Sequence, residues 1–173
     1  MVAAFAACSS RKSSTSITPF SPLGYAAPRF DWPIARGKLS SGFGLRHGVM
    51  HEGIDIAAPV GTPVMAAAAG QVIFVGRMRG YGNIVIIEHQ SHYVTVYAHD
   101  SSNLVREGQN IRQGQLIGYV GRSGRTTGAN LHFEVRHNSV AKNPLAYLLL
   151  PPAYDDHATR LAGGGGSRYF PAQ

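Results

Sequence analysis

The 173-residue sequence has only one cysteine, Cys8. One cysteine excludes an internal disulfide framework, and the absence of a Cys-x-x-Cys pair excludes a cysteine-based zinc knuckle and a thioredoxin-like motif. Charged residues are also few: they make up 14% of the chain, with nine Asp and Glu against sixteen Lys and Arg. The formal charge of +7 predicts attraction to anionic polymers, which include nucleic acid, anionic lipid and the bacterial wall.

Long hydrophobic runs are absent as well. No stretch of the sequence reaches the ~20 apolar residues that are needed to cross a bilayer. The length is that of about one domain. With 21 Gly, 10 Pro and 44% hydrophobic residues, the composition is typical of a globular, turn-rich protein that favours β-structure.

The two ends of the chain differ in composition from its middle. Residues 9–29 begin with a Ser-rich polar run and contain three prolines, so we interpret them as a flexible tether. Residues 30–150 consist of short apolar runs separated by glycine and are predicted to form the folded domain. Residues 151–173 contain four consecutive glycines and are interpreted as a flexible C-terminal tail.

Residues 1–8 end in Phe5-Ala6-Ala7-Cys8, which resembles the end of a bacterial lipoprotein signal. This resemblance implies a lipidated Cys8 that anchors the protein to a membrane of the bacterial cell envelope, in the periplasm or at the outer surface. Only seven residues precede Cys8, fewer than a full signal peptide contains. The alternative is a chance run of small residues before a free thiol.

Runs of β-branched and aromatic residues predict the fold class. Residues 83–88 and 93–99 are such runs, and the short polar segment between them predicts a β-hairpin. Helix is nearly absent, apart from a closing turn expected at 144–150. Further short strands, separated by glycine-containing turns, are expected at 71–75, 115–120 and 131–136. The pattern predicts a single all-β domain, an antiparallel sandwich or barrel.

Histidines and carboxylates are the residues that can carry chemistry. His51 and Asp55 are four residues apart, directly after a glycine-rich segment. The segment is not an HExxH motif, so Glu52 is not interpreted as a zincin-type base. In the predicted strand 131–136, alternation directs His132 away from the core. Asn130, Glu134 and Arg136 share its face.

His99 lies in the second strand of the predicted hairpin. Alternation there places His99 on one face with Thr95 and Tyr97, at the end of the strand and free to face a cleft. Two neutral imidazoles and one carboxylate form a suitable catalytic zinc site, because three protein ligands leave a fourth position for water. A further histidine outside the coordination shell can exchange protons with that water, and His99 fits this role.

Several motifs follow one another along the predicted domain: Gly42-Phe43-Gly44 with Arg46, His51 to Asp55, Gly61-Thr62-Pro63-Val64, Gly80-Tyr81-Gly82-Asn83, Tyr97-Ala98-His99, Gly114-Gln115-Leu116-Ile117-Gly118 and Leu131-His132-Phe133-Glu134. In this order they resemble the M23 family of lysostaphin- and LytM-type peptidases. The resemblance implies a zinc-dependent endopeptidase that cleaves the peptide cross-links of bacterial peptidoglycan. It also implies that His51, Asp55 and His132, the second histidine of the family's HxH motif, bind Zn2+.

The chain departs from the family at Asn130. The resemblance implies two catalytic histidines that do not bind the metal, which are His99 and the first histidine of HxH, and Asn130 stands at that second position. An asparagine forms hydrogen bonds but does not take up a proton near neutral pH. If Asn130 supports the reaction by hydrogen bonding, activity is retained and His99 moves the protons. The alternative is a catalytically impaired zinc-binding module that binds cell wall or activates an amidase.

Other residues allow two interpretations. Glu134 either supports a metal ligand through a hydrogen bond or is a surface carboxylate. The basic residues Arg77, Arg79, Arg122 and Arg125 either line a groove for an acidic polymer or form a solvated face. The remaining histidines are expected to be solvated or in turns, namely His47, His89, His92, His137 and His157.

Two further functions are disfavoured. A biotinyl or lipoyl carrier needs a lysine on an exposed hairpin, and the only lysines are Lys12, Lys38 and Lys142. No recognition-helix, zinc-finger or RRM signature accompanies the positive charge, so nucleic-acid binding is not expected. The chain is expected to act as a monomer.

Overall fold

The computed structural model describes residues 28–46 and 48–149. The signal-like segment with Cys8, nearly all of the predicted tether and the predicted tail 151–173 lie outside the described residues, as do His47 and His157. Within the described part, no helix is long and apolar enough to cross a bilayer.

Strands dominate the described chain, with two short 3-10 helices. The elements are β1 (Lys38–Ser41), β2 (Gly44–Arg46), β3 (Val49–His51), β4 (Ile54–Ala57), β5 (Pro63–Met65), β6 (Gly70–Met78), β7 (Gly82–Glu88), η1 (Gln90–His92), β8 (Tyr93–Asn103), β9 (Asn110–Ile111), β10 (Leu116–Val120), β11 (Asn130–His137), β12 (Val140–Lys142) and η2 (Pro144–Ala146). The expected all-β antiparallel fold is confirmed.

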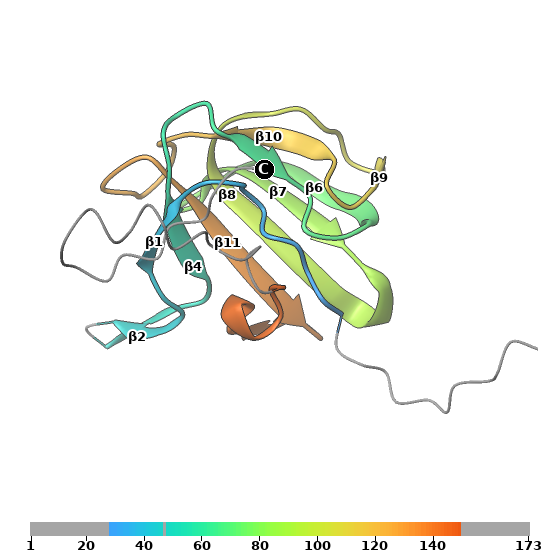
Figure 1. Cartoon of the computed structure of the whole chain (residues 1–173), viewed down its shortest axis with the longest axis horizontal. Helices are drawn as coiled ribbons and strands as arrows, with labels where there is room; N and C mark the ends of the chain where they lie inside the picture. Colours follow the sequence, from blue (N-terminus) through green and yellow to red (C-terminus); the bar gives the residue numbers. More distant parts are fainter. Residues whose placement is uncertain (1–27, 47, 150–173) are drawn as a thin grey trace, which may run out of the picture.

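One antiparallel sheet contains ten of the strands, in the central order β1-β4-β11-β8-β7-β6-β9. The long strand β8 pairs with β11 and β7 over most of its length, and its last residues pair with β10. The hairpin of β2 and β3 is separate and extends from the lower left of the view in Figure 1. The sheet thus brings β4, β11, β8 and β7 side by side, and these strands or the loops next to them carry the residues of interest.

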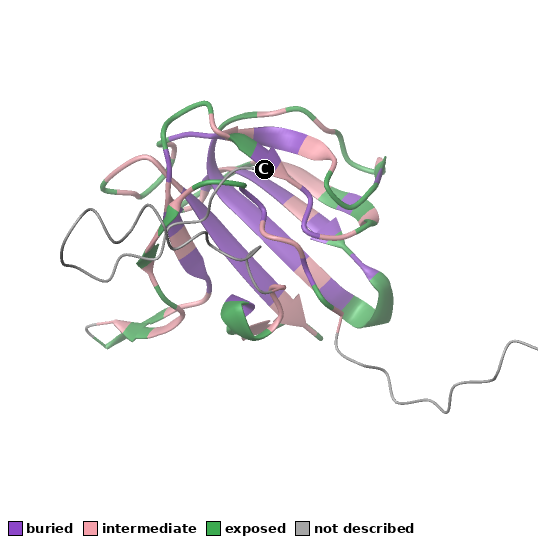
Figure 2. Ribbon diagram, viewed as in Figure 1, coloured by how far each residue is buried: buried purple, intermediate pink, exposed green. Residues whose placement is uncertain are grey.

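The two faces of the sheet have different roles. Figure 2 shows that the central strands are buried and that the exposed residues lie at the rims. The main core covers one face and includes Phe30, Ile54, Tyr97 and Phe133, all with no exposed surface. Burying each such side chain contributes about 1.5–3 kcal/mol. On the opposite face, Ile84, Val96 and Ala98 form a smaller cluster.

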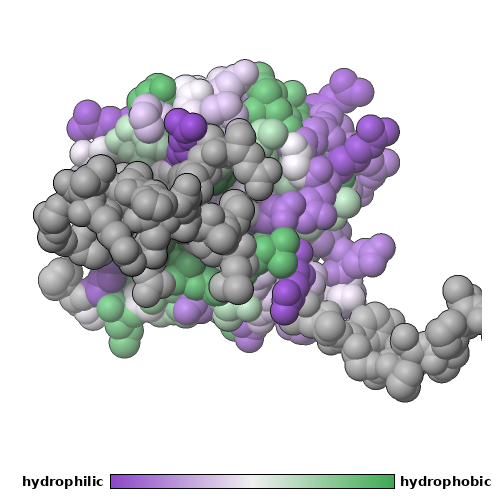
Figure 3. Space-filling model, viewed as in Figure 1, coloured by the Kyte–Doolittle hydropathy of each residue, from purple (hydrophilic) through white to green (hydrophobic). Residues whose placement is uncertain are grey.

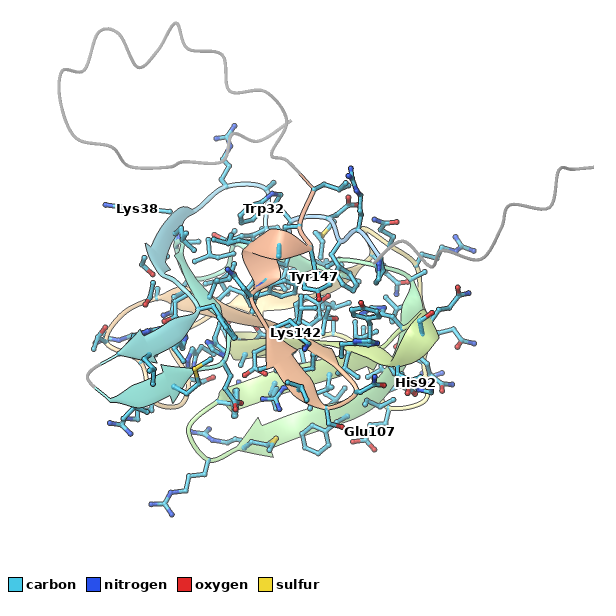
Figure 4. The ribbon with its side chains drawn as sticks, turned by 90° about the horizontal axis from the view of Figure 1, so that it is seen from below. Trp32, Lys38, His92, Glu107, Lys142 and Tyr147 are labelled. Carbon is cyan, nitrogen blue, oxygen red and sulfur yellow. The ribbon has the colours of Figure 1, made fainter. Side chains whose placement is uncertain are left out.

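Residues before β1 and after β12 close the main core. The Trp32 indole donates a hydrogen bond to the Leu149 carbonyl at 2.9 Å, and Phe30 forms an isolated bridge with Leu148. Figure 4 shows Trp32 and Tyr147 on the same side of the molecule, beside the ribbon of η2. On the face drawn in Figure 3, the hydrophobic residues that are visible form small separate patches.

The expected hairpin is confirmed as β7 and β8, but the predicted side-chain alternation is wrong at His99. Tyr97 and Thr95 lie in the interior with no exposed surface. His99 instead has a left-handed backbone, with φ of 68°. Ile84 pairs with Ala98 while Asn83 pairs with Asp100, so His99 is the extra residue of a β-bulge. The bulge rotates His99 out of the Tyr97 face, and β8 continues to Asn103, so His99 is not at a strand end.

His89 lies in the connection between β7 and η1, as one of the two alternatives expects, but it is not solvated, because the residue is only 8% exposed. Its Nδ1 lies 2.8 Å from the Ala69 carbonyl and its Nε2 lies 2.8 Å from Thr95 Oγ1, which in turn bonds the Tyr97 hydroxyl. Burial lowers the pKa of His89. The ring is therefore a neutral member of a buried hydrogen-bonded chain rather than a solvated group. His92 is exposed, as expected, whereas His137 is half-buried.

Asp100 follows the bulge and has no exposed surface. Neither of its carboxylate oxygens has a hydrogen-bond partner within the described part of the chain. Burial alone raises the pKa of Asp100 to about 8. The carboxyl group is therefore protonated in the folded protein at neutral pH, whereas it ionises freely in the unfolded chain.

This difference predicts that Asp100→Asn stabilises the protein. Because the folded pKa lies above the unfolded one, the wild type is not penalised below pH 4 and loses stability as the pH rises toward 8. At pH 7 we expect the variant to gain about 1 kcal/mol or more in the free energy of unfolding, and at pH 4 little. Urea unfolding at both pH values measures this. The partly exposed Asp31→Asn serves as the control, and an equal gain at both pH values would contradict the explanation.

Candidate metal centre

The pairing of β4 with β11 forms the centre of the site. In this register Asp55 is the direct partner of His132. His51 ends β3 and reaches the same place through the short turn at Glu52 and Gly53. A Cβ atom at Gly53 would lie 2.5 Å from the Phe133 carbonyl oxygen and 2.8 Å from His132 Cε1. Only glycine allows this turn to pack so closely against β11.

The three predicted metal ligands come together in the structure. His132 Nδ1 lies 2.8 Å from Asp55 Oδ1, and His51 Nε2 lies 3.2 Å from each of these two atoms. Among the described residues this is the only group of three His, Cys, Asp or Glu side chains arranged to hold a metal ion. All three residues are largely buried, with side chains at most 15% exposed.

The hydrogen-bond partners of the outer ring nitrogens determine which nitrogen of His51 and of His132 carries the proton. His51 Nδ1 lies 2.7 Å from the Gly42 carbonyl oxygen, and His132 Nε2 lies 3.0 Å from Glu134 Oε1. Each of these oxygens accepts a hydrogen bond, so each outer nitrogen carries the proton. The inner nitrogens then direct lone pairs toward the Asp55 carboxylate. Three converging acceptors need a cation between them, and two imidazoles with one carboxylate suit zinc.

Glu134 supports His132 from behind. Its side chain has no exposed surface, and besides the His132 bond it accepts hydrogen bonds from the Tyr81 hydroxyl at 2.7 Å and from Arg136 Nε at 2.6 Å. Arg136 also pairs with Glu52. This network holds the ring of His132 in one orientation, as carboxylates commonly do for zinc-binding histidines.

The electrostatics of the site favour a positive charge. Burial raises the pKa of Asp55, but hydrogen bonds from His132 and Arg46 outweigh it and leave the pKa lowered. Burial likewise lowers the pKa of His132, but the bonds to Asp55 and Glu134 raise it overall to about 9. Without a metal the converging acceptors therefore hold a proton, and a metal cation competes with that proton for the same place.

His99 lies next to the ligands without joining them. Its ring centroid is 5.9 Å from that of His132, and its Nδ1 donates to the Ser123 carbonyl at 2.7 Å. Burial is the main cause that lowers the pKa of His99. The ring is therefore neutral near pH 7, with the proton on Nδ1 and a lone pair on Nε2. That is the form a general base requires.

Asn130 begins β11 and lies two residues before His132 on the same face. Its side chain is half-buried, and its Oδ1 accepts a hydrogen bond from Thr126 Oγ1 at 3.3 Å. Asn130 makes no hydrogen bond to a predicted ligand within the described chain. Its side chain therefore makes no described hydrogen bond that holds the three candidate ligands in place.

The contacts of Tyr81, Arg46 and Arg136 could not be predicted from the sequence. Tyr81 and Arg46 lie in the quoted motifs, but nothing in their spacing indicates that they bond Glu134 and Asp55. A cavity of about 280 Å³ continues from Glu134 over the apolar face of the sheet. Its walls include Met78, Ile86 and Val94. Neighbouring strands supply these residues, so no local pattern could identify the cavity.

The chain is similar in sequence and in structure to known proteins. A profile of peptidase family M23 matches residues 49–144. The chain is 40% identical to the uncharacterized lipoprotein YgeR of Escherichia coli, over 83% of this chain and 59% of the relative. It is 46% identical to the DD-carboxypeptidase/endopeptidase Mpg of Neisseria meningitidis, over 69% of this chain and 29% of the relative.

The murein hydrolase activator NlpD of Escherichia coli is 43% identical, over 68% of this chain and 30% of the relative. The chain thus spans less than two thirds of the length of these curated relatives. Among solved structures, a zinc-containing peptidase from Vibrio cholerae superposes with a TM-score of 0.65 at 36% identity, over 69% of this chain and 40% of that chain.

The contacts of Glu134 predict its contribution to metal binding. Glu134→Gln removes the negative charge of the group that accepts the hydrogen bond from His132 Nε2–H. We therefore expect the affinity for Zn2+ to fall about 10- to 100-fold. Competition with a chromophoric chelator measures this affinity. The exposed Glu88→Gln is the matched control, and thermal melting of each variant shows whether it folds. Unchanged zinc affinity in a folded Glu134→Gln protein would contradict the assignment.

Proposed function

The chain belongs to peptidase family M23, and from this premise we propose that it is a zinc-dependent endopeptidase that cleaves the peptide cross-links of bacterial peptidoglycan. The observation that carries the proposal is the convergence of the acceptor atoms of His51, Asp55 and His132, at 2.8–3.2 Å from one another, beside a neutral His99. These three side chains would hold the ion. A bound zinc ion supplies Lewis acidity, which acidifies water and polarises a peptide carbonyl.

Two of the protein's own residues would transfer the proton and stabilise the developing negative charge. As the water oxygen bonds to the carbonyl carbon, His99 Nε2 takes the water proton. His99 then gives that proton to the leaving nitrogen as the C–N bond breaks. The Asn130 amide can donate a hydrogen bond to the negative charge that develops on the carbonyl oxygen.

Several observations support the proposed substrate and the proposed location of the protein. The name of the Neisseria relative describes a carboxypeptidase and endopeptidase, and the apolar cavity beside Glu134 offers room for a peptide side chain. The formal charge of +7 favours an anionic wall. We place the protein in the cell envelope as a monomer anchored through Cys8, which agrees with the lipoprotein relative.

A second candidate function is a zinc-binding module that activates a wall hydrolase without cleaving peptides itself. Two observations favour it: Asn130 stands where the family resemblance implies a catalytic histidine, and one relative is named a murein hydrolase activator. The ligand geometry is equally compatible with this function, because Asn130 takes no part in holding the ligands.

Digestion of purified peptidoglycan, with zinc content measured in the same samples, tests the proposal. We expect the wild type to bind about one zinc per chain and to release muropeptides, and a chelator to abolish the release. Asp55→Ala should lose both metal and activity. His99→Ala should keep its zinc but lose activity by about 10²- to 10⁴-fold, because only proton transfer is removed.

Asn130→His separates the two functions. A zinc-loaded wild type that leaves the wall intact, together with an active Asn130→His variant, would replace the endopeptidase proposal by the activator. An active wild type that Asn130→His does not improve would exclude the activator as the main function.

A further inference from the structure

Four exposed arginines lie on or next to two loops that contact His99. Arg77 and Arg79 lie at the end of β6 and in the turn to β7, and Arg122 and Arg125 lie in the loop between β10 and β11. No Asp or Glu occurs in residues 71–87 or 108–133. These two segments therefore carry positive charge without any acidic residue of their own.

The two loops are packed tightly against each other. The Arg125 backbone N–H donates to the Gly80 carbonyl at 2.7 Å, and the Asn83 N–H donates to Ser123 Oγ at 2.9 Å. A Cβ atom at Gly82 would lie 2.3 Å from Ser123 Oγ, and one at Gly124 would lie 2.4 Å from the Gly82 nitrogen. Both glycines also have positive φ, so the loops meet in a fixed backbone arrangement.

This packing places the backbone of Arg79 and Arg125 close to His99 and His132. Ser123, two residues before Arg125, accepts the hydrogen bond from His99 Nδ1. Tyr81, two residues after Arg79, has its ring centroid 5.6 Å from that of His132. Arg79 and Arg125 thus flank the groups that contact the candidate base and a candidate metal ligand.

None of the four arginines has an anionic partner among the described residues, where Arg46 and Arg136 are the arginines in ion pairs. Among residues 28–46 and 48–149, the described bond of the Arg122 guanidinium goes to the Thr127 carbonyl. Guanidinium groups bind carboxylates with two parallel hydrogen bonds, and a ligand carboxylate would also reduce the repulsion among the four charges.

We propose that Arg79 and Arg125 bind a free carboxylate of the peptide substrate, next to the bond that is cleaved. This inference rests on the proposed peptide-binding function. It specifies the substrate class as peptides whose carboxyl groups are free rather than amidated. A small cluster at one edge of the site suits a carboxylate on a short peptide better than a long anionic polymer, which would need a charged track.

Binding measured by calorimetry tests this without requiring turnover. The ligands are two peptidoglycan-derived peptides that differ only in a free or amidated carboxyl group, and the protein is the zinc-loaded full chain. We expect the wild type to bind the free acid roughly tenfold more tightly than the amide, and Arg79→Gln/Arg125→Gln to bind both equally. The exposed pair Arg106→Gln/Arg112→Gln is the control and should keep the preference.

Several outcomes would overturn the inference. One is a folded double variant that keeps the wild-type preference, and another is an equal loss in the control pair. A third outcome uses polyphosphate as the ligand. If the wild type binds the free acid and the amide equally, and the double variant loses polyphosphate binding, then the arginines bind an anionic polymer instead. Calorimetry measures binding and does not depend on cleavage. A protein that binds these peptides without cleaving peptidoglycan would therefore refute the proposed endopeptidase, while the preference for the free acid could still be measured.

Discussion

The pairing of β4 with β11 is the constraint on which the rest of the site depends. It sets Asp55 directly opposite His132, although 77 residues separate them in the chain. Adjacent partners on one face of a sheet have Cβ atoms about 4.5–5.5 Å apart, so two short side chains meet without any loop having to adjust. His51 then needs only the tight turn at Gly53 to complete the group. A one-residue slip of β11 would turn His132 into the main core and Phe133 toward the solvent. The hydrophobic core thus fixes the same register that brings the candidate metal ligands together.

The bulge in β8 connects function with stability. A regular strand would leave His99 on the interior face with Tyr97, far from the ligands. The left-handed conformation at His99 rotates its ring toward His132 and shifts the following residue, Asp100, into the interior without a partner. Bulges often re-aim a side chain beside a functional site. Here the same local distortion that turns the candidate base His99 toward the site also buries the Asp100 carboxyl group, so the arrangement costs stability at neutral pH.

Sequence patterns predict those parts of the structure that depend on local periodicity. The strands β7 and β8 and the outward face of His132 follow from runs of β-branched residues and from alternation. The short strands β1 to β5 do not, because three or four residues are too few to show a clear alternation, and β1, β2 and β5 also include Ser, Gly or Pro. Alternation also fails at His99, since one extra residue reverses every later position. His89 is buried for a reason that no local pattern contains: its partners Ala69 and Thr95 come from two neighbouring segments of the fold. The three candidate ligands became recognisable through the order of motifs along the chain, not through any single spacing.

The contacts that orient the three candidate ligands do not include Asn130, the residue on which the proposed catalysis depends. The ligands are oriented by Gly42, Arg46 and Glu134, and Glu134 is in turn held by Tyr81 and Arg136. Asn130 belongs to none of these contacts; its described side-chain bond is to Thr126. Substitution at position 130 can therefore change the chemistry while the metal centre remains intact. The buried network around the three candidate ligands would be costly to lose, and the described hydrogen bond of the Asn130 side chain lies outside it.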